Sequence, residues 1–391
     1  MNKILRLLSI IGCSVAVFIG MQHFSRSGGG ALVAIAFALA GFAIWYIEYR
    51  QSLQGEAKIH AVGKKKAGFD WGMHYFRAFA ILTIMATHYF SIYGQTTVKE
   101  VLFTGSTIYF LFISGYLCQY IDLRRRDSPL VYYRKKLTNV ICPFLVFSIL
   151  LSLAYNLVEF NFGFVYKIFL GRVQVQYWYI PFVSALFLVS PLICRAHNRL
   201  LIVITLVSLF FFLLFPFRPG VRFRISWPYT FYLYSYFTFF YVVGFLYCRF
   251  KETIDGYIKP YWYLFLTGAV SVLLILWRPE VFGLGCIARG FAIGMQRFLM
   301  IICAIIGLSY IKDKKIWVLD QLAKYSFTLY FIHVAVFKHS ALAHNFLISR
   351  SCFSVLITDI IIFILFVAVM LVLSMALKMV IGKHSRLFIG T

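Results

Sequence analysis

The sequence predicts an all-α, polytopic transmembrane helical bundle of about 12 spans. Hydrophobic residues make up 62% of the 391 residues, and charged residues make up only 13%. The hydrophobic residues gather in runs such as ALVAIAFALAGFAIWYIEY and TDIIIFILFVAVMLVLSMAL, each long enough to cross a bilayer as a helix. These runs do not alternate polar with apolar residues, which excludes a transmembrane β-barrel.

Twelve segments of about twenty apolar residues follow one another along the chain. The first follows Lys3 and Arg6, as the apolar part of a signal peptide would, but a second apolar run comes directly after it. This arrangement favours an uncleaved helix. The expected spans are 4–24, 31–49, 71–93, 100–121, 139–159, 178–194, 200–217, 229–248, 261–277, 290–311, 316–337 and 351–377.

The charged residues indicate how these spans are oriented. Lys and Arg number 38 against 13 acidic residues, which gives a formal net charge of +25. If the N-terminus is cytoplasmic, about two thirds of the Lys and Arg residues fall in cytoplasmic segments, as the positive-inside rule requires. The bias favours both termini inside, and it explains the basic composition without nucleic acid as a partner.

The chain divides at one basic stretch, YRQSLQGEAKIHAVGKKKAGF. We expect two N-terminal transmembrane helices (1–50), a basic cytoplasmic linker (51–68) and a ten-helix membrane domain (69–391). The eight cysteines are scattered through apolar segments without a C-x-x-C pair or a histidine at ligand spacing, so we expect no metal site. With no soluble domain in the pattern, any chemistry must take place in or at the membrane.

One predicted span, 71–93, carries two ionisable groups in the stretch RAFAILTIMATH. Arg77 and His88 are separated by eleven steps of 100°, so their side chains share a helix face, roughly 16 Å apart along the axis. Alone, Arg77 could snorkel to the inner headgroups and His88 could be an ordinary core histidine. On one face of a membrane helix, together they favour a polar cavity.

The pattern Arg-x10-His on the opening helix of a ten-helix body resembles membrane acyltransferase family 3, bacterial enzymes that O-acylate exported glycans. Further stretches resemble the family in the same order: GSTIYFLFISGYL (105–117), YYRKKLTNVICPFLVFS (132–148), QYWYIPFVSALFLVSPLI (176–193) and YSFTLYFIHVAV (325–336). The resemblance makes 69–391 a membrane acyltransferase domain and leaves the first two spans unexplained.

The chain also departs from the family pattern at two places. The family often has an aspartate three residues before the arginine of the first helix, where this chain has His74, and Asp70 stands seven before. The family's basic segment often reads R-x-x-R, and the matching positions here are Lys136 and Asn139. We therefore transfer no role to Asp70, and one cation expected near the donor is missing.

The resemblance implies acetyl-CoA or another acyl-CoA as the co-substrate on the cytoplasmic side and a saccharide hydroxyl as the acceptor. Coenzyme A is polyanionic, and basic side chains bind its phosphates well. The densest group of cations in the chain is the expected donor site, although positive-inside loops have such groups without any ligand. It comprises Arg124, Arg125, Arg126, Arg134, Lys135 and Lys136.

Acyl transfer to a hydroxyl needs a base, and histidine is the side chain best suited to that role near neutral pH. We expect His88 to act as that base or as a transient acyl carrier, and Arg77 to orient the donor or stabilise oxyanion charge. Ser114 and His333, in two family motifs, are candidate pocket residues, although His333 also suits helix packing.

Three further features are open. Trp178 suits an interfacial anchor or a sugar-stacking platform. Arg222 and Arg224, in the predicted outer loop, could dock an anionic glycan or simply be solvated. Asp359 is costly in a span unless it is paired, and Arg297 is a candidate partner.

The sequence thus favours a multi-pass O-acyltransferase of the bacterial cytoplasmic membrane that modifies a cell-surface or lipid-linked polysaccharide such as an O-antigen. A transporter or flippase for a glycan or an acyl-bearing substrate is the main alternative, but no internal duplication supports it. Expected partners are the bilayer, acyl-CoA and the glycan. A partner acyltransferase or a homo-oligomer stays open.

Overall fold

The computed structural model describes residues 69–125, 128–155, 162–215, 227–283, 285–351 and 354–391, and all regular structure among them is helical. The all-α prediction is therefore confirmed for this part of the chain. The two N-terminal spans and the linker lie outside the described residues. One compact unit contains nearly all of the chain from Phe69 onward.

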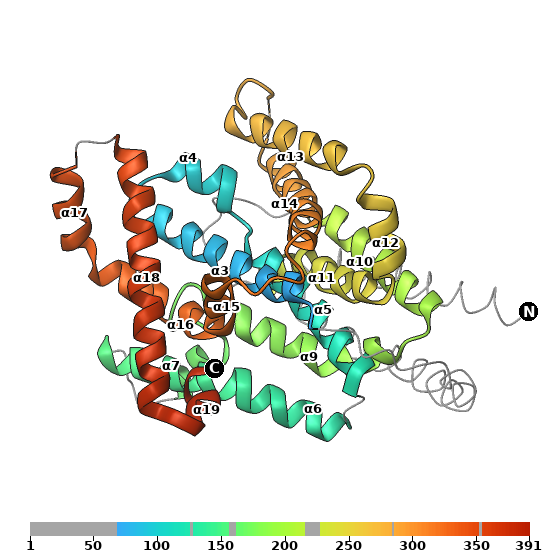
Figure 1. Ribbon diagram of the computed structural model, residues 1–391, viewed down its shortest axis with the longest axis horizontal. Helices are drawn as coiled ribbons and strands as arrows, with labels where there is room; N and C mark the ends of the chain where they lie inside the picture. Colours follow the sequence, from blue (N-terminus) through green and yellow to red (C-terminus); the bar gives the residue numbers. More distant parts are fainter. Residues whose placement is uncertain (1–68, 126–127, 156–161, 216–226, 284, 352–353) are drawn as a thin grey trace, which may run out of the picture. The chain divides into compact units, whose positions relative to one another are not determined.

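The described helices follow one another without strands between them (Figure 1). The first ten segments are α3 (Trp71–Ile92), α4 (Thr96–Val98), η2 (Lys99–Phe103), α5 (Thr107–Arg125), α6 (Pro129–Lys136), η3 (Leu137–Ile141), α7 (Cys142–Ala154), α8 (Phe162–Phe169), α9 (Tyr179–Arg195) and α10 (Asn198–Leu214). The remaining ten are α11 (Trp227–Arg249), α12 (Lys251–Ile258), α13 (Trp262–Trp277), α14 (Cys286–Ser309), α15 (Trp317–Lys324), α16 (Ser326–His339), α17 (Ala341–Ser349), α18 (Val355–Ile381), η4 (Gly382–His384) and α19 (Ser385–Ile389).

Four helical stretches among the described residues are long and apolar enough to cross a membrane: Lys99–Arg124, Pro129–Ala154, Ile287–Ser309 and Val355–Ile389. A fifth is possible if the pair α12 and α13, bent by 76°, forms one broken span. Helix α3 has a suitable length but is less apolar, because it carries Arg77 and His88. The prediction of twelve spans therefore stays a prediction.

Two predicted spans differ clearly from the helices observed. The span expected at 316–337 is two helices, α15 and α16, which meet at Tyr325. The span expected at 139–159 begins ten residues earlier, because α6, η3 and α7 continue one another from Pro129. Proline at the first turn of α6 needs no backbone donor there, so it favours this earlier start.

Helix α3 occupies the centre of the fold and packs against α5, α14, α15 and α16. Its first turn begins where the Asp70 carboxylate accepts a hydrogen bond from the Met73 backbone N–H at 3.0 Å. An Asp at this position typically stabilises a helix by about 1 kcal/mol. The same carboxylate pairs with Lys251, so it also ties α3 to α12.

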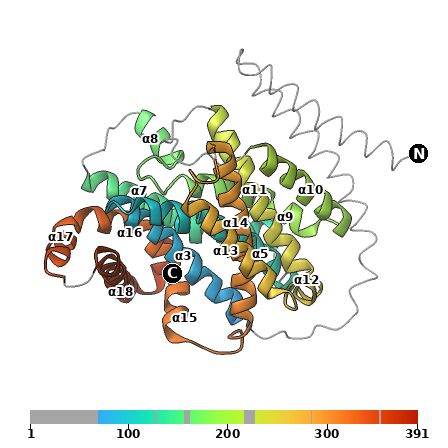
Figure 2. The ribbon, with the colours of Figure 1, turned by 90° about the horizontal axis from the view of Figure 1, so that it is seen from above.

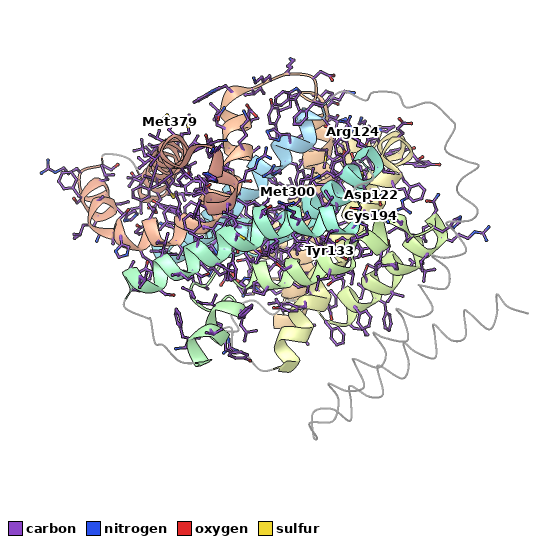
Figure 3. All side chains as sticks on the ribbon, turned by 90° about the horizontal axis from the view of Figure 1, so that it is seen from below. Asp122, Arg124, Tyr133, Cys194, Met300 and Met379 are labelled. Carbon is purple, nitrogen blue, oxygen red and sulfur yellow. The ribbon has the colours of Figure 1, made fainter. Side chains whose placement is uncertain are left out.

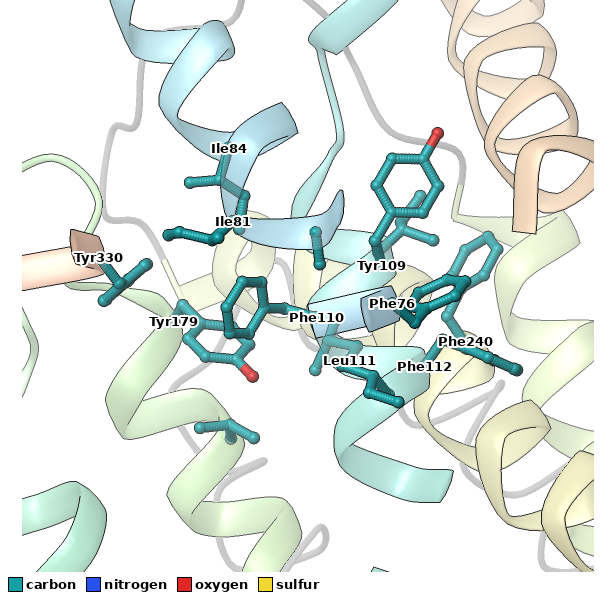
Figure 4. Close-up of a cluster of buried hydrophobic side chains, with 14 of the residues drawn as sticks. Phe76, Ile81, Ile84, Tyr109, Phe110, Leu111, Phe112, Tyr179, Phe240 and Tyr330 are labelled. Atoms are coloured by element: carbon teal, nitrogen blue, oxygen red, sulfur yellow. The ribbon is translucent and has the colours of Figure 1, made fainter. Parts of the chain in front are cut away.

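The core around α3 and α5 is largely aromatic (Figure 4). Phe76 of α3 contacts Tyr109 and Phe112 of α5, and Phe110 contacts Tyr179 of α9. This accounts for part of the high aromatic content, which interfacial belts alone could not explain. Viewed from above, α17 and α18 lie side by side at one end of this unit (Figure 2).

Candidate active site

The two ionisable residues of α3 both face α16. At the N-terminal end of α3, the Arg77 guanidinium donates to the Ser326 hydroxyl at 3.0 Å. Further along, the rings of His88 and His333 lie 5.2 Å apart between centroids. The order of these contacts shows that α3 and α16 run in the same direction. The shared face predicted for Arg77 and His88 is therefore confirmed.

His333 has two chemically different ring nitrogens. Its side chain is fully buried, and Nδ1 lies 3.0 Å from the Leu329 carbonyl. Because a carbonyl oxygen only accepts, Nδ1 carries the proton and Nε2 keeps its lone pair. Nε2 is buried and has no hydrogen-bond partner among the described residues. The lone pair of Nε2 is thus available to a proton or a donor group.

His88 is half-buried, and its ring forms no hydrogen bond with a described residue. Its ring plane is inclined by 49° to that of His333. Two histidines this close inside a helical bundle create a polar point in otherwise apolar surroundings, which is typical of a substrate or proton pathway. The pair can accept and deliver a proton between two bound groups.

A second polar pair lies near Arg77. The His74 ring Nε2 donates to the Asp320 carboxylate at 3.1 Å, and Lys324 donates to the same carboxylate at 2.7 Å. His74 stands where the family often has an aspartate, and here the carboxylate comes from α15 instead. This pair could not be predicted from the sequence, because nothing in either segment alone links residues 246 positions apart.

Ser114 is connected to the histidine pair through two tyrosines. Its hydroxyl lies 3.2 Å from the Tyr179 hydroxyl. The Tyr179 ring contacts that of Tyr330, which in turn contacts His333 with 6.1 Å between centroids. Figure 4 shows Tyr179 and Tyr330 beside Phe110. The two tyrosines stand in the family-like stretches 176–193 and 325–336, in which the residues expected to matter were Trp178 and His333.

The Trp178 ring lies beside the Tyr179 ring, with 6.5 Å between centroids. Its ring is half-buried and contacts Phe182 and Phe237, at 6.2 and 5.3 Å between centroids. It packs within an aromatic cluster between α9 and α11, and no described contact brings it to His88 or His333.

The basic residues predicted to bind the donor occupy α5 and α6. Lys136 points inward: its ammonium group lies 3.8 Å from the Phe187 ring centroid and 3.6 Å from the Cys118 sulfur. Lys135 is half-buried and Arg134 is exposed, whereas Arg124 lies over the Tyr120 ring at the end of α5 (Figure 3).

Several predicted site residues are beyond what the structure describes. Arg126, Arg222 and Arg224 lie outside the described residues, and Arg125 ends α5 without a described side chain. Among the described residues, no group of three or more His, Cys, Asp or Glu side chains is arranged to hold a metal ion.

The pairing suggested for Asp359 is wrong. Asp359 accepts hydrogen bonds from His344 at 2.8 Å, from Gln95 at 2.9 Å and from Tyr89 at 3.4 Å. Arg297 is fully buried elsewhere and donates to the carbonyls of Thr104 and Val101, at 2.9 and 3.2 Å. Both buried groups have hydrogen-bond partners, as burial requires, but the two sets of partners are separate.

Fold and site together define a helical membrane protein in which His88 of the central helix α3 lies beside the buried His333 of α16, and Arg77 lies on the same face of α3. The family model described as an acyltransferase domain matches residues 70–379. The chain belongs to this family, membrane acyltransferase family 3, and the protein is an acyltransferase. No curated protein and no solved structure matches the chain.

Proposed function

We propose that the protein transfers an acyl group, with acetyl the expected one, from cytoplasmic acyl-CoA to a hydroxyl of a cell-surface or lipid-linked saccharide. The observation that carries the proposal is the pair His88–His333, in which a buried ring nitrogen has no protein partner. In this proposal both termini are cytoplasmic and the protein lies in the bacterial inner membrane. The N-terminal end of α3, with Arg77, then faces the donor.

The reaction needs one proton to move from the acceptor to the leaving group. The acceptor oxygen attacks the thioester carbonyl, a C–O bond forms, and the C–S bond to coenzyme A breaks. His88 removes the hydroxyl proton and returns it to the departing thiolate, with His333 as its proton partner. Alternatively, His88 carries the acyl group between the two substrates. Arg77 stabilises negative charge on the carbonyl oxygen or the donor.

The basic residues at α5 and α6 suit a polyanionic donor. The Lys136 ammonium lies against aromatic rings and a thiol and has no carboxylate partner among the described residues. Its charge is therefore not neutralised and remains available to a phosphate. Cys118, which contacts Lys136, stands four residues after Ser114 on α5. Ser114 in turn is connected to His333 through the side chains of Tyr179 and Tyr330.

The proposal is tested in cells that lack the protein and carry either the unaltered chain or one variant. We expect His88→Ala and Arg77→Ala to abolish acyl esters on purified surface polysaccharide, measured by mass spectrometry, while both variants still insert in the membrane. His339→Ala is the control, because His339 is an exposed histidine on the same helix as His333, stacked on Tyr155. Unchanged acylation with His88→Ala would contradict the proposal.

A second assay separates an enzyme from a transporter. Detergent-solubilised protein is mixed with acetyl-CoA alone, and binding and the slow release of free coenzyme A are measured. We expect both with the unaltered chain, because a site built for acyl transfer binds the donor before the acceptor arrives. A glycan flippase has no reason to bind acetyl-CoA.

A further inference from the structure

Two lysines lie at the end of the site opposite Arg77. Lys99 belongs to η2 and is half-buried, and Lys338 is exposed at the end of α16. The segment of Lys99 packs on α3, and Lys338 stands on α16 in the turn after His333, whose ring lies beside His88. In the proposed topology this end of α3 faces outward, where the positive-inside rule disfavours Lys and Arg.

The segment that carries Lys99 is fixed against the His88 turn of α3. The Thr87 hydroxyl donates to the Phe103 carbonyl at 2.7 Å, and the Phe90 and Phe103 rings stack 5.5 Å apart. On its other side, the buried Arg297 donates to the Val101 and Thr104 carbonyls. The position of Lys99 near His88 is therefore imposed by contacts on both sides of its segment.

Lys338 is positioned in a similar way on the second helix of the site. The Tyr93 hydroxyl of α3 donates to the carbonyl of Phe337, the residue before Lys338, at 2.6 Å. This bond ties the end of α16 to the end of α3. Both lysines are thus carried by segments that are bonded to α3 within about two turns of His88.

Neither ammonium group has an ion-pair or hydrogen-bond partner among the residues that the structure describes. The neighbouring residue Glu100 does not neutralise Lys99, since Glu100 pairs with Arg289 at 2.6 Å. Each uncompensated ammonium group would repel a protonated imidazole at His88. An anion bound between them removes that repulsion, which is how charged sites select their ligands.

We propose that the acceptor is an anionic glycan whose carboxylate or phosphate binds Lys99 and Lys338 while its hydroxyl meets His88. This inference rests on the proposed function and names the substrate class for the same site. The phosphates of the donor do not meet these lysines, because the donor approaches from the Arg77 end, roughly 16 Å away along α3.

The test uses full-length protein in liposomes, labelled acetyl-CoA, and surface polysaccharide purified from cells that lack the protein. Lys99→Met and Lys338→Met should each raise the KM for the polysaccharide about tenfold, which corresponds to roughly 1.4 kcal/mol, and leave the KM for acetyl-CoA unchanged. Lys99→Arg and Lys338→Arg should restore the KM. Arg350→Met is the control, because Arg350 is an exposed cation that lies over Phe346.

The source of the anion is identified by treating the polysaccharide. The carboxylates of one portion are chemically reduced, and the phosphates of another portion are removed with hydrofluoric acid. With the unaltered protein, one of these two portions should show the raised KM for the polysaccharide. An unchanged polysaccharide KM in both Met variants would overturn the inference, as would a rise in the acetyl-CoA KM instead. Absence of transfer by the unaltered protein would remove the proposed function, and this inference with it.

Discussion

At His333 the helix backbone decides which ring nitrogen can react. The Leu329 carbonyl, one turn earlier, fixes the Nδ1 proton, so the lone pair of Nε2 is left without a protein partner in a buried position. Leaving such a group unsatisfied costs about 1–3 kcal/mol. We infer that the cost is offset only when substrate or a protonated partner is present.

Replacement of His333 by phenylalanine tests this role. Phe fills a similar volume beside Tyr330 and Phe337, so the fold should persist, but it cannot exchange a proton. We expect kcat to fall about 100-fold or more, with the KM for acetyl-CoA unchanged. Steady-state kinetics of the purified variant measure the effect, and His339→Phe serves as the matched control. A kcat within a few-fold of the unaltered protein would leave His333 only a packing role.

Asp70 gives a prediction on stability against pH. Burial raises the pKa of its carboxyl, but the hydrogen bond and charge of Lys251, with further donors at Met73 and Tyr116, outweigh it and leave the pKa below its ordinary value. Ionised Asp70 therefore stabilises the fold above its ordinary pKa, and this contribution is lost as the pH falls through the lowered value.

Asp70→Asn should accordingly lower the Tm in detergent at pH 7 and leave a difference that shrinks as the pH falls below the ordinary pKa of the carboxyl group. Thermal unfolding followed by tryptophan fluorescence would measure this. Asp313→Asn is the control, because Asp313 is exposed. A Tm difference that stays constant over this range would show that the carboxylate charge of Asp70 does not stabilise the fold.

The residues of the site were partly predictable from the sequence. Spacing alone placed Arg77 and His88 on one face, since it depends only on the geometry of a single helix. The partners of Asp359 and Arg297 were not predictable, because apart from His344 the partners described above come from segments distant in sequence. The sequence shows His74 only as a departure from the family pattern. Its partner Asp320 could not be predicted, because the contact depends on how α15 packs on α3.

Among the helices, the crossing of α5 and α11 depends on two glycines. A Cβ atom on Gly115 would lie 2.0 Å from the Tyr241 carbonyl oxygen, and one on Gly244 would lie 2.1 Å from that of Phe112. The two backbones therefore meet closely, as in other membrane helix pairs with small residues at the contact. This gives the glycine of the S-G-Y-L motif a packing role and holds Ser114 next to Tyr179.

Gly115→Ala should therefore destabilise the protein, because the clash involves backbone atoms that cannot move aside. We expect a Tm several degrees lower and reduced acyl transfer, since Ser114 is adjacent. Gly307→Ala is the matched control: Gly307 lies in α14 with open space around it, and alanine there should be neutral or stabilising by about 1 kcal/mol. Equal Tm values for both variants would exclude the close crossing.

The pattern of apolar residues does not predict where a helix breaks or where short helices form. The run 316–337 predicts one span, yet the chain forms two helices that meet at Tyr325, with Asp320 bonded to His74 and Ser326 bonded to Arg77. The short helices α8, α12 and α17 were not expected, since segments of eight or nine residues have no clear period. The sequence therefore predicts that the long apolar helices exist, but it does not predict where a helix breaks.

For the whole molecule, the account depends on which side of the membrane each end of α3 faces. The bias of Lys and Arg predicts that both termini and the α5–α6 connection are cytoplasmic. A phosphatase that is active only outside the cytoplasm, fused after Thr391, should therefore be inactive, and a fluorescent protein at the same place should fluoresce. Fusion within 340–350, after α16, should give the opposite pair of results. An active phosphatase after Thr391 would contradict the proposed orientation of donor and acceptor.

The fold class was predictable from composition because only a helical bundle can bury this much apolar surface without alternation. The family followed from the order of five motifs and is now shown over residues 70–379. The substrates were not predictable to the same degree, since they are recognised by side chains that several segments bring together. Lys99 and Lys338 illustrate this, because they belong to segments distant in sequence, η2 and α16, which only the fold ties to the same end of α3.

We propose above that the protein transfers an acyl group from acyl-CoA to a glycan hydroxyl and that this transfer requires His88. The most direct test is transfer of label from acetyl-CoA to purified polysaccharide by the protein in liposomes, comparing the unaltered chain with His88→Ala. The account predicts labelled polysaccharide, with the label released by mild base as an ester is, and no label above background with His88→Ala. Equal labelling by both proteins would contradict it.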